Sequence, residues 1–193
     1  VYKRQELVDN LPARLERKLF MHNTGHAVCG YLGHLKHYAL MCDAVADPEI
    51  AAITRGAMIE SGEALILKHG FARDSIDAYR EDFFPRVGAR AIADPVQRVI
   101  RSPLRKIGRN ERLIGPACMC LDYGIEPRNL ASGIAALLRY HAHDDPESEE
   151  TQRALRDAGV AETLRKLVGL DIVKYRSLID LVVASPIWQA HEA

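Results

Sequence analysis

Residues 47–70, DPEIAAITRGAMIESGEALILKHG, carry the start and stop features of one long helix. Asp47 stands directly before Pro48, so a carboxylate meets the positive end of the helix dipole and the proline takes a first-turn position that needs no N–H. Gly70 suits the left-handed residue that ends a helix. The apolar residues between these ends recur at helical spacing: Ile50, Ile53, Ala57, Ala64, Leu65 and Leu67. The stretch therefore predicts a helix of about 20 residues.

The same features recur along the chain. Asp94-Pro95 and Glu126-Pro127 repeat the pairing of an acidic residue with a following proline and predict two more helix starts. No repeat, low-complexity tract or linker is evident, so we predict an all-α fold and a single domain over residues 1–193. Spacing of apolar residues predicts the other helices near 10–21, 25–37, 74–88, 95–101, 110–123, 127–142, 148–158, 161–168 and 171–184.

The composition is that of a soluble globular protein. The chain has 193 residues, 48% hydrophobic and 27% charged, and its 26 basic residues balance its 26 acidic ones. Zero net charge gives no overall attraction to nucleic acid or to an anionic membrane. No apolar run approaches the roughly 20 residues that cross a bilayer, and residues 1–10 are too polar for a signal peptide. We therefore expect a cytoplasmic protein with neither nucleic acid nor membrane as a partner.

Cysteine and glycine patterns give no support to three common kinds of site. The cysteines have neither the spacing of a zinc knuckle nor the number of a disulfide framework: Cys29, Cys42, Cys118 and Cys120. A glycine-rich dinucleotide turn and a P-loop are both missing from the sequence. Because Val1 is not an initiator methionine, we expect the chain to be part of a longer polypeptide.

A polar cluster occupies residues 18–26, KLFMHNTGH. Lys18 lies in the C-terminal part of the first predicted helix, and Asn23 and His26 follow it. In an unbroken helix Lys18 and His26 would lie about 80° apart, whereas a break at residues 23–25 would let the three polar side chains converge. An apolar stripe runs beside the lysine: Leu11, Leu15 and Leu19.

Such a trio suits the oxidation of an alcohol or the reduction of a carbonyl. A lysine partly desolvated beside an apolar stripe has its charged form disfavoured, so the neutral amine can accept a proton. Asparagine and histidine can donate hydrogen bonds to an oxygen that gains negative charge. The spacing also fits a solvated lysine that ends a helix, followed by an ordinary Asn-Thr-Gly turn.

The histidine spacing argues against a metal. His22 and His26 are four residues apart but lack the glutamate of H-E-x-x-H, and His34 and His37 have no carboxylate or cysteine close by in sequence. We therefore expect no metal. A further polar group at the end of a predicted helix receives no role: Tyr140, His141 and His143.

A concentrated positive segment lies between residues 98 and 112, where the only acid is Glu111. Its arginines recur close to one helical face, although Pro103 and Gly108 must bend it. Guanidinium groups suit bidentate contact with a phosphate, and the alternative is a solvated surface paired with acids. Aromatic residues do not alternate with the basic ones, which argues against nucleic acid. The basic residues are Arg98, Arg101, Arg105, Lys106, Arg109 and Arg112.

Three blocks of this sequence resemble one enzyme family. DNLPARLERKLFMHNTGHAVCGYLGHLKHY, residues 9–38, is similar to the start of the C-terminal domain of the polyol-specific long-chain dehydrogenases, whose active site has the pattern K-x(4)-N-x-x-H. RSPLRKIGRNERLIGP (101–116) and LRYHAHDDPES (138–148) extend the likeness. The wording NTGHA…YLG is most similar to the mannitol-1-phosphate 5-dehydrogenase branch. The resemblance implies a multi-helical substrate domain, like the C-terminal domain of 6-phosphogluconate dehydrogenase.

The resemblance also implies roles. Lys18 would take the proton from the substrate hydroxyl as hydride leaves the same carbon for NAD, and Asn23 and His26 would hold and polarise the reacting oxygen. No metal is needed. The pattern R-x-P-[IL]-R-K-[IL]-G marks the phosphate-specific branch, within which Arg105 and Lys106 are favoured. The candidate phosphate ligands are Arg101, Arg105, Lys106 and Arg112.

Two departures from the family accompany the likeness. His37 stands where the phosphate-specific branch commonly has glycine in Y-L-G-x-L-K-G. Family members also carry an N-terminal Rossmann domain, which this sequence lacks, so NAD is expected to bind mainly there and this chain alone should not transfer hydride. The expected function is the C-terminal domain of an enzyme that interconverts mannitol 1-phosphate and fructose 6-phosphate. The alternatives are a mannitol 2-dehydrogenase or uronate reductase domain, or a non-catalytic helical module that binds sugar phosphates.

Overall fold

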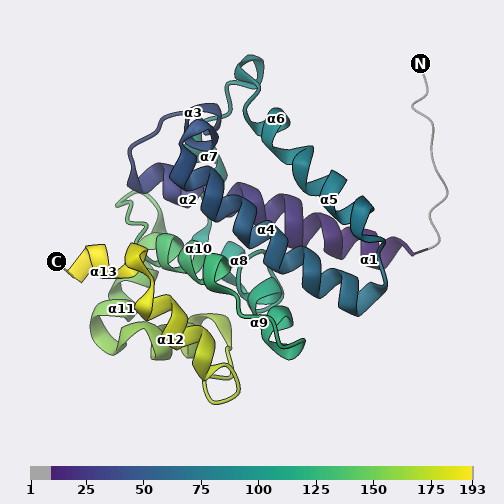
Figure 1. Ribbon diagram of the computed structural model, residues 1–193. Helices are drawn as coiled ribbons and strands as arrows, with labels where there is room; N and C mark the ends of the chain where they lie inside the picture. Colours follow the sequence, from purple (N-terminus) through teal and green to yellow (C-terminus); the bar gives the residue numbers. More distant parts are fainter. Residues whose placement is uncertain (1–9, 193) are drawn as a thin grey trace.

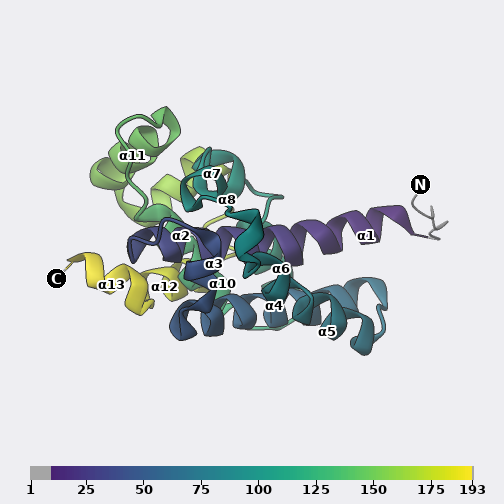
Figure 2. The ribbon, with the colours of Figure 1, turned by 90° about the horizontal axis from the view of Figure 1, so that it is seen from above.

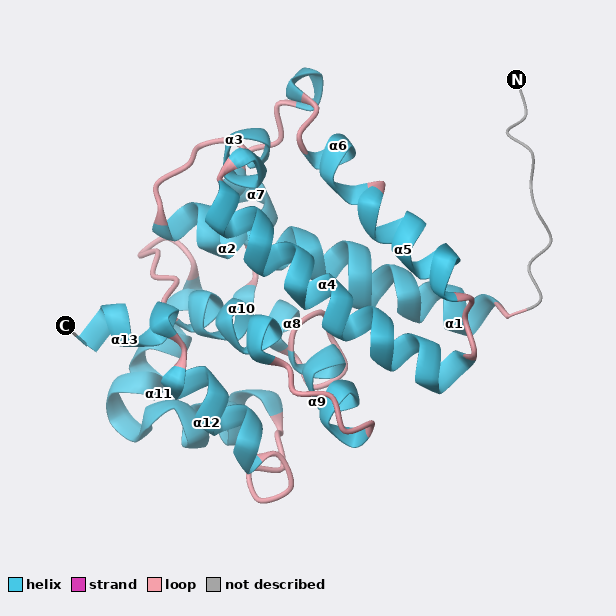
Figure 3. Ribbon diagram, viewed as in Figure 1, coloured by secondary structure: helices cyan, strands magenta, loops and turns pink. Residues whose placement is uncertain are grey.

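The computed structural model describes residues 10–192. Residue 193 and residues 1–9 lie outside it, and the latter include most of the polar start for which no signal peptide is expected. Helices and their connections make up the described part, with one isolated bridge between Leu40 and Pro95 and no strand (Figure 3). The predicted all-α class is confirmed. None of the helices within residues 10–192 is long and apolar enough to cross a membrane.

The elements follow one another through short connections (Figure 1). They are α1 (Leu11–Arg17), η1 (Lys18–Asn23), α2 (Thr24–Leu35), α3 (Met41–Ala46), α4 (Pro48–His69), α5 (Arg73–Glu81), α6 (Phe83–Val87), η2 (Arg90–Ile92), α7 (Val96–Ile100), α8 (Pro103–Ile107), α9 (Ile114–Asp122), α10 (Arg128–Leu138), α11 (Pro146–Thr163), η3 (Leu164–Val168), α12 (Arg176–Ala184) and α13 (Pro186–Glu192).

The long helix α4 has the ends that its sequence predicts. The Asp47 carboxylate accepts hydrogen bonds from the backbone N–H groups of Glu49 (2.9 Å) and Ile50 (3.1 Å), two of the donors that a helix start leaves free. Gly70 ends the helix in the left-handed region, with φ of 69°. A non-glycine residue there would be strained.

The other two acid-proline pairs start their helices one residue later than predicted. Helix α7 begins at Val96 and α10 at Arg128, so each proline is the cap residue rather than the first helical residue. Asp94 pairs instead with Arg98 at 2.6 Å. The acid therefore meets a side chain of the first turn and not the free backbone donors.

Helices α2, α4 and α10 pack on one another and form the centre of the molecule (Figure 1). Their contacting faces are buried and rich in small residues, which lets the backbones approach closely. At Gly133 of α10, a β-carbon would lie 2.6 Å from a methyl group of Val28 on α2. Alanine at position 133 would therefore push these two helices apart, an overpacking change that typically costs about 1–3 kcal/mol.

A buried carboxylate joins α4 to the start of α10. Glu60 is 8% exposed and accepts hydrogen bonds from the backbone N–H of Asn129 (2.8 Å), its side-chain amide (2.7 Å) and the N–H of Leu130 (2.9 Å). It does for α10 what a local cap residue does elsewhere. Loss of this carboxylate would leave buried donors unpaired, at a cost of about 1–3 kcal/mol each.

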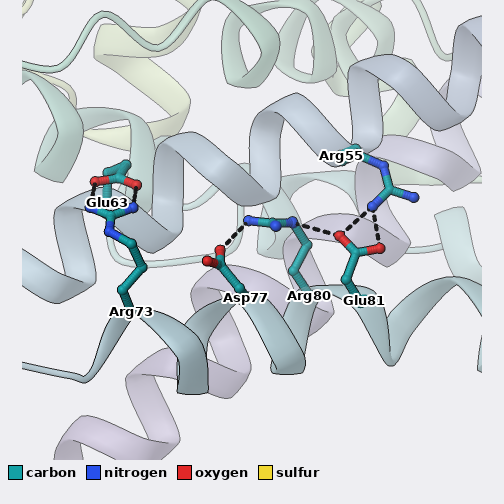
Figure 4. A network of polar contacts seen from close by, with 6 residues as sticks. All are labelled: Arg55, Glu63, Arg73, Asp77, Arg80 and Glu81. Atoms are coloured by element: carbon teal, nitrogen blue, oxygen red, sulfur yellow. Dashed lines mark hydrogen bonds and ion pairs between the residues drawn. The ribbon is translucent and has the colours of Figure 1, made fainter.

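Two separate groups of ion pairs on the surface connect α5 to α4 (Figure 4). Arg80 contacts Asp77 at 2.7 Å and Glu81 at 3.0 Å, and Arg55 of α4 also binds Glu81. Arg73 pairs with Glu63 of α4. Exposed pairs of this kind contribute at most about 1 kcal/mol each, so they add little to the stability of the contact between α5 and α4.

Several predicted helices have different bounds in the structure. The stretch 74–88 is divided into α5 and α6, and residues 110–113 of the expected 110–123 helix lie outside α9. Helix α11 bends at Gly159, whose φ and ψ are 73° and 178°, near the predicted gap between 148–158 and 161–168. The helices α3, α8 and α13 were not predicted, because six, five and seven residues are too few for apolar periodicity to show.

Candidate active site

The residues 18–26 form part of a continuous helical rod, and the break predicted at residues 23–25 is wrong (Figure 2). Asn23 and Thr24 keep right-handed helical angles, with φ of −72° and −61°. Gly25 is present for close packing: a β-carbon on it would lie 2.9 Å from both the Met58 sulfur and the Phe83 ring. The glycine makes room for other helices and does not end its own.

A π-helical turn, η1, replaces the expected break and brings the polar trio to one side of the rod. Its hydrogen bonds run from i to i+5, so it adds about one residue to a turn. From Lys18 to His26, eight positions along the chain, the side-chain direction then turns about the helix axis by roughly 700° rather than 800°. The two side chains therefore point in directions about 20° apart around that axis. By the same reasoning Asn23 lies about 40° from Lys18 instead of about 140°. Such turns are frequent at functional sites.

Lys18 is exposed, which corrects the expectation that an apolar stripe would partly desolvate it. Leu11 and Leu15 of that stripe are themselves 55% and 57% exposed. Only Leu19 of the stripe packs against the core, so the stripe does not shield the amine from water.

His22 and His26 are two neutral rings in contact. Their centroids are 4.6 Å apart, and both meet the edge or face of Phe83, at 5.6 and 5.2 Å. Burial lowers the pKa of His26, and burial together with His26 lowers the pKa of His22 to about 4. His26 Nδ1 lies 3.2 Å from the carbonyl oxygen of His22. Because a carbonyl only accepts, this contact assigns the proton to Nδ1 and leaves Nε2 of the neutral ring as an acceptor.

The basic segment, residues 98–112, lies beside this rod. Its arginine spacing predicts one helical face, but the segment is not a single helix. It contains the short helix α8 between Ser102, whose φ is 57°, and Gly108, where the helix ends. Side chains of α2 hold both ends of the segment. The Tyr31 hydroxyl donates to the carbonyl of Ile100 at 2.8 Å, and the Thr24 hydroxyl donates to the carbonyl of Arg112 at 2.6 Å.

One pocket of about 560 Å³ brings the trio and the basic segment together. All seven predicted site residues line it: three from the rod and four from the segment. Arg98 also lines it but is paired with Asp94 at 2.6 Å. No carboxylate is among the lining residues, which are Lys18, His22, Asn23, His26, Ala27, Arg98, Val99, Arg101, Ser102, Arg105, Lys106 and Arg112.

Lys106 is the desolvated lysine of this pocket. It is only 6% exposed, and burial, with Arg112 and Arg105 nearby, lowers its pKa to about 8. Its amine has no ion-pair partner among the side chains that the structure describes. A negatively charged ligand would relieve both the repulsion and the unpaired charge.

Arg112 and Arg109 have different surroundings although they lie three residues apart. Arg112 lines the pocket, and its Nη1 is buried without a hydrogen bond, 3.4 Å from a Glu111 carboxylate oxygen. Arg109 points elsewhere, with its guanidinium 5.0 Å from the Tyr175 ring centroid and 3.0 Å from its hydroxyl. Of these two arginines, only Arg112 is among the predicted phosphate ligands.

Sequence reasoning missed four of the residues that shape this pocket. Thr24 belongs to an Asn-Thr-Gly sequence that is typical of a turn, yet it is fully buried and holds the basic segment. Ser102 lines the pocket in a left-handed conformation directly before a proline, which is doubly disfavoured and marks a strained position. His22 and Val99 also line the pocket. Only their place between the recognised motifs could have drawn attention to them.

The comparisons with known proteins agree with this architecture. A profile of the mannitol dehydrogenase C-terminal domain matches residues 10–180. The Pseudomonas fluorescens mannitol 2-dehydrogenase, in a ternary complex with NAD and D-mannitol, has a TM-score of 0.76 and 19% identity over 96% of this chain and 39% of that chain. A substrate-free D-sorbitol dehydrogenase has a TM-score of 0.69 and 18% identity, over 92% and 39%.

This chain therefore corresponds to 39% of the length of each of these two relatives. At such identities the two solved structures establish the shared fold, and the family profile spans most of the described residues. Together with the helical architecture, the match shows that the chain belongs to the mannitol dehydrogenase C-terminal domain family.

Proposed function

We propose that this chain is the substrate domain of an NAD-dependent dehydrogenase that interconverts D-mannitol 1-phosphate and D-fructose 6-phosphate. A separate N-terminal Rossmann domain of the same polypeptide would bind most of the NAD. The observation that carries the proposal is the single pocket in which Lys18, Asn23 and His26 face a group of cations and no carboxylate. A neutral polyol has no use for that charge, whereas a polyol phosphate does.

The basic segment would hold the phosphate. Arg105 and Arg101 are exposed at the pocket, and Lys106 lies beneath them with its amine unpaired. Guanidinium groups bind phosphate oxygens bidentately, and the lysine adds a point charge. Contacts with the phosphate end of the substrate fix the position of its carbon chain in the pocket. One carbon that carries a hydroxyl group is thereby placed next to the rod.

The trio would act on that carbinol. Lys18, in its neutral form, takes the hydroxyl proton as the C–H bond breaks, and returns it during carbonyl reduction. The Asn23 amide can donate a hydrogen bond to the reacting oxygen. With Nδ1 donating to the His22 carbonyl, neutral His26 can accept from a substrate hydroxyl through Nε2, a role opposite to the donor role expected from sequence. NAD, when bound, accepts the hydride.

The chain contributes no dinucleotide turn of its own, so this half of the site depends on the other domain for the coenzyme. Lys18 is exposed and is therefore accessible to a second domain. The residues present fit substrate binding and proton transfer, and they do not fit an independent NAD site.

Substrate preference of the complete polypeptide tests the proposal. We expect turnover of mannitol 1-phosphate with NAD to exceed that of mannitol by orders of magnitude. The double variant Arg105→Ala, Lys106→Ala should raise KM for mannitol 1-phosphate strongly and change kcat less, because it removes binding away from the reacting carbon.

Arg109→Ala is the matched control. It removes a cation from the same segment, but one that contacts Tyr175 and does not line the pocket. Its KM should therefore stay near the parent value. Equal or better use of mannitol, or an equal KM increase in Arg109→Ala, would contradict the phosphate assignment.

The cationic pocket also suits a second substrate class, the uronates, whose carboxylate is an anion as well. A uronate reductase of the same superfamily would reduce a keto-uronate in preference to fructose 6-phosphate. Assaying both substrates in the reductive direction separates the two functions. Binding of fructose 6-phosphate without any turnover in the complete polypeptide would instead indicate a non-catalytic sugar-phosphate-binding module.

A further inference from the structure

A group of potential metal ligands lies between α10 and α11, outside the pocket. His141 and His143 come from the connection after α10, and Glu149 comes from the first turn of α11. One ligand atom from each of these residues lies within 4.8 Å of the other two. Among the residues whose side chains the structure describes, no other group of three histidine, cysteine or carboxylate ligands is so close. The proposed reaction gives these residues no role.

We propose that His141, His143 and Glu149 form a surface binding site for a divalent first-row cation of the zinc type. Two imidazole nitrogens and one carboxylate oxygen are a common zinc ligand set, with water completing the tetrahedron. The mixture of nitrogen with one oxygen favours Zn²⁺ over Mg²⁺ or Ca²⁺, which prefer oxygen ligands.

The side chains already converge on one atom. His141 Nε2 lies 3.0 Å from Glu149 Oε1, and His143 Nδ1 lies 2.7 Å from the same oxygen. Ligands at zinc distances of about 2.0–2.2 Å are about 3.4 Å apart in a tetrahedron, so each contact must open by less than about 1 Å. The exposed fractions of the three side chains, 40%, 88% and 40%, leave room for that adjustment.

The backbone beneath these ligands is held in place by buried hydrogen bonds. The Ser148 hydroxyl accepts from the N–H of Ala142 at 2.9 Å and donates to the carbonyl of Tyr140 at 3.2 Å. The Gln152 amide donates to the same carbonyl at 2.9 Å and to that of Leu138 at 2.7 Å. The loop with the histidines is thereby attached to the helix with the glutamate, so little backbone ordering is needed on binding.

Local charge favours a cation at this position. Residues 144–150 contain five acidic residues and no basic one. Asp145 is used to cap α11, accepting from the N–H groups of Glu147 at 3.1 Å and Ser148 at 3.3 Å. The remaining carboxylates raise the local concentration of cations around the cluster.

Calorimetric titration of zinc into the EDTA-dialysed 193-residue chain tests this site. We expect saturable binding of one equivalent, and titration with Co²⁺ should give the strong visible absorption of a tetrahedral site. The variant His141→Ala, His143→Ala should abolish both responses, and Glu149→Gln should weaken them, since the amide carries no charge. These side chains are exposed, and circular dichroism will show that the variants remain folded.

His37→Ala is the matched control, because His37 is an exposed histidine on a connection and belongs to no such group. It should bind zinc as the parent chain does. Full retention of binding in the double histidine variant, or no saturable binding by the parent, would overturn the proposal. Neither result bears on the sugar-phosphate pocket, which shares no residue with this cluster.

Discussion

The two lysines of the pocket differ in their surroundings and therefore in what each can do. Lys18 is exposed on the π turn, while Lys106 is 6% exposed under the basic segment. Sequence reasoning assigned the desolvated position to Lys18, because burial was inferred from a leucine stripe in its own helix. The structure assigns it to Lys106, because burial depends on which other elements pack over a side chain.

Replacement of Lys18 tests the proton-transfer role. In the complete polypeptide, Lys18→Ala should lower kcat by about 10²–10⁴-fold, the usual contribution of a general base. Coenzyme affinity, measured by fluorescence titration with NADH, should stay the same. Lys36→Ala is the control, since Lys36 is exposed and paired with Asp47 and Glu49 on the surface. Near-normal turnover in Lys18→Ala would mean that the lysine is only a cation at the end of a turn.

Lys106 predicts proton uptake when a sugar phosphate binds. Its pKa is lowered to about 8 in the free pocket, chiefly by burial. A bound phosphate raises that pKa again, so at pH 8 binding should take up at most about half a proton, and affinity should fall as pH rises above 8. The phosphate itself, with a second pKa of about 6, is already dianionic there.

Calorimetry of fructose 6-phosphate binding in two buffers of different ionisation enthalpy measures this uptake. Lys106→Arg keeps the positive charge but stays protonated at this pH. The Lys106→Arg variant should bind fructose 6-phosphate without taking up a proton, and its affinity should not fall above pH 8. Equal uptake in parent and Lys106→Arg would show that the proton goes to another group.

At the scale of elements, the ends of the long helix α4 could be predicted from sequence, whereas the π turn in the first rod could not. The ends of α4 follow from Asp47, Pro48 and Gly70, because capping involves only neighbours in sequence. The π turn in the first rod was not predictable from residues 18–23. It needs the surrounding helices to stabilise a less favourable hydrogen-bond pattern, and residue types carry little information about it.

The end of α2 shows where resemblance and structure agree. His37 occupies the position at which the phosphate-specific branch commonly has glycine, and its φ is 62°. A side chain in this left-handed region costs roughly 1 kcal/mol, which glycine avoids. The replacement of glycine by His37 therefore puts a side chain on a left-handed residue in the turn after α2.

His37→Gly should therefore stabilise the chain by about 1 kcal/mol and raise Tm by about 2–4 °C, as measured by calorimetric unfolding. His37→Ala keeps the left-handed strain but loses the imidazole, so it should leave Tm unchanged. The difference between the two variants isolates the backbone effect. A glycine variant no more stable than the alanine variant would refute this explanation.

At the scale of the whole molecule, α2 connects the core to the pocket. Its inner face packs on α4 and α10, while Thr24 and Tyr31 reach out to hold both ends of the basic segment. Two groups of residues about 80 positions apart in sequence thus line one pocket. Packing of the central helices, rather than any local motif, sets the distance between the polar trio and the cations.

The sequence by itself determined the helical class, the ends of α4 and seven of the residues that line the pocket, because capping, periodicity and motif spacing are local properties. Tertiary structure alone decided that the rod continues through a π turn, that Lys106 rather than Lys18 is buried, and that Arg109 turns away from its neighbours. Each of these depends on contacts between segments distant in sequence. Burial and charge proximity arise only when those segments pack together.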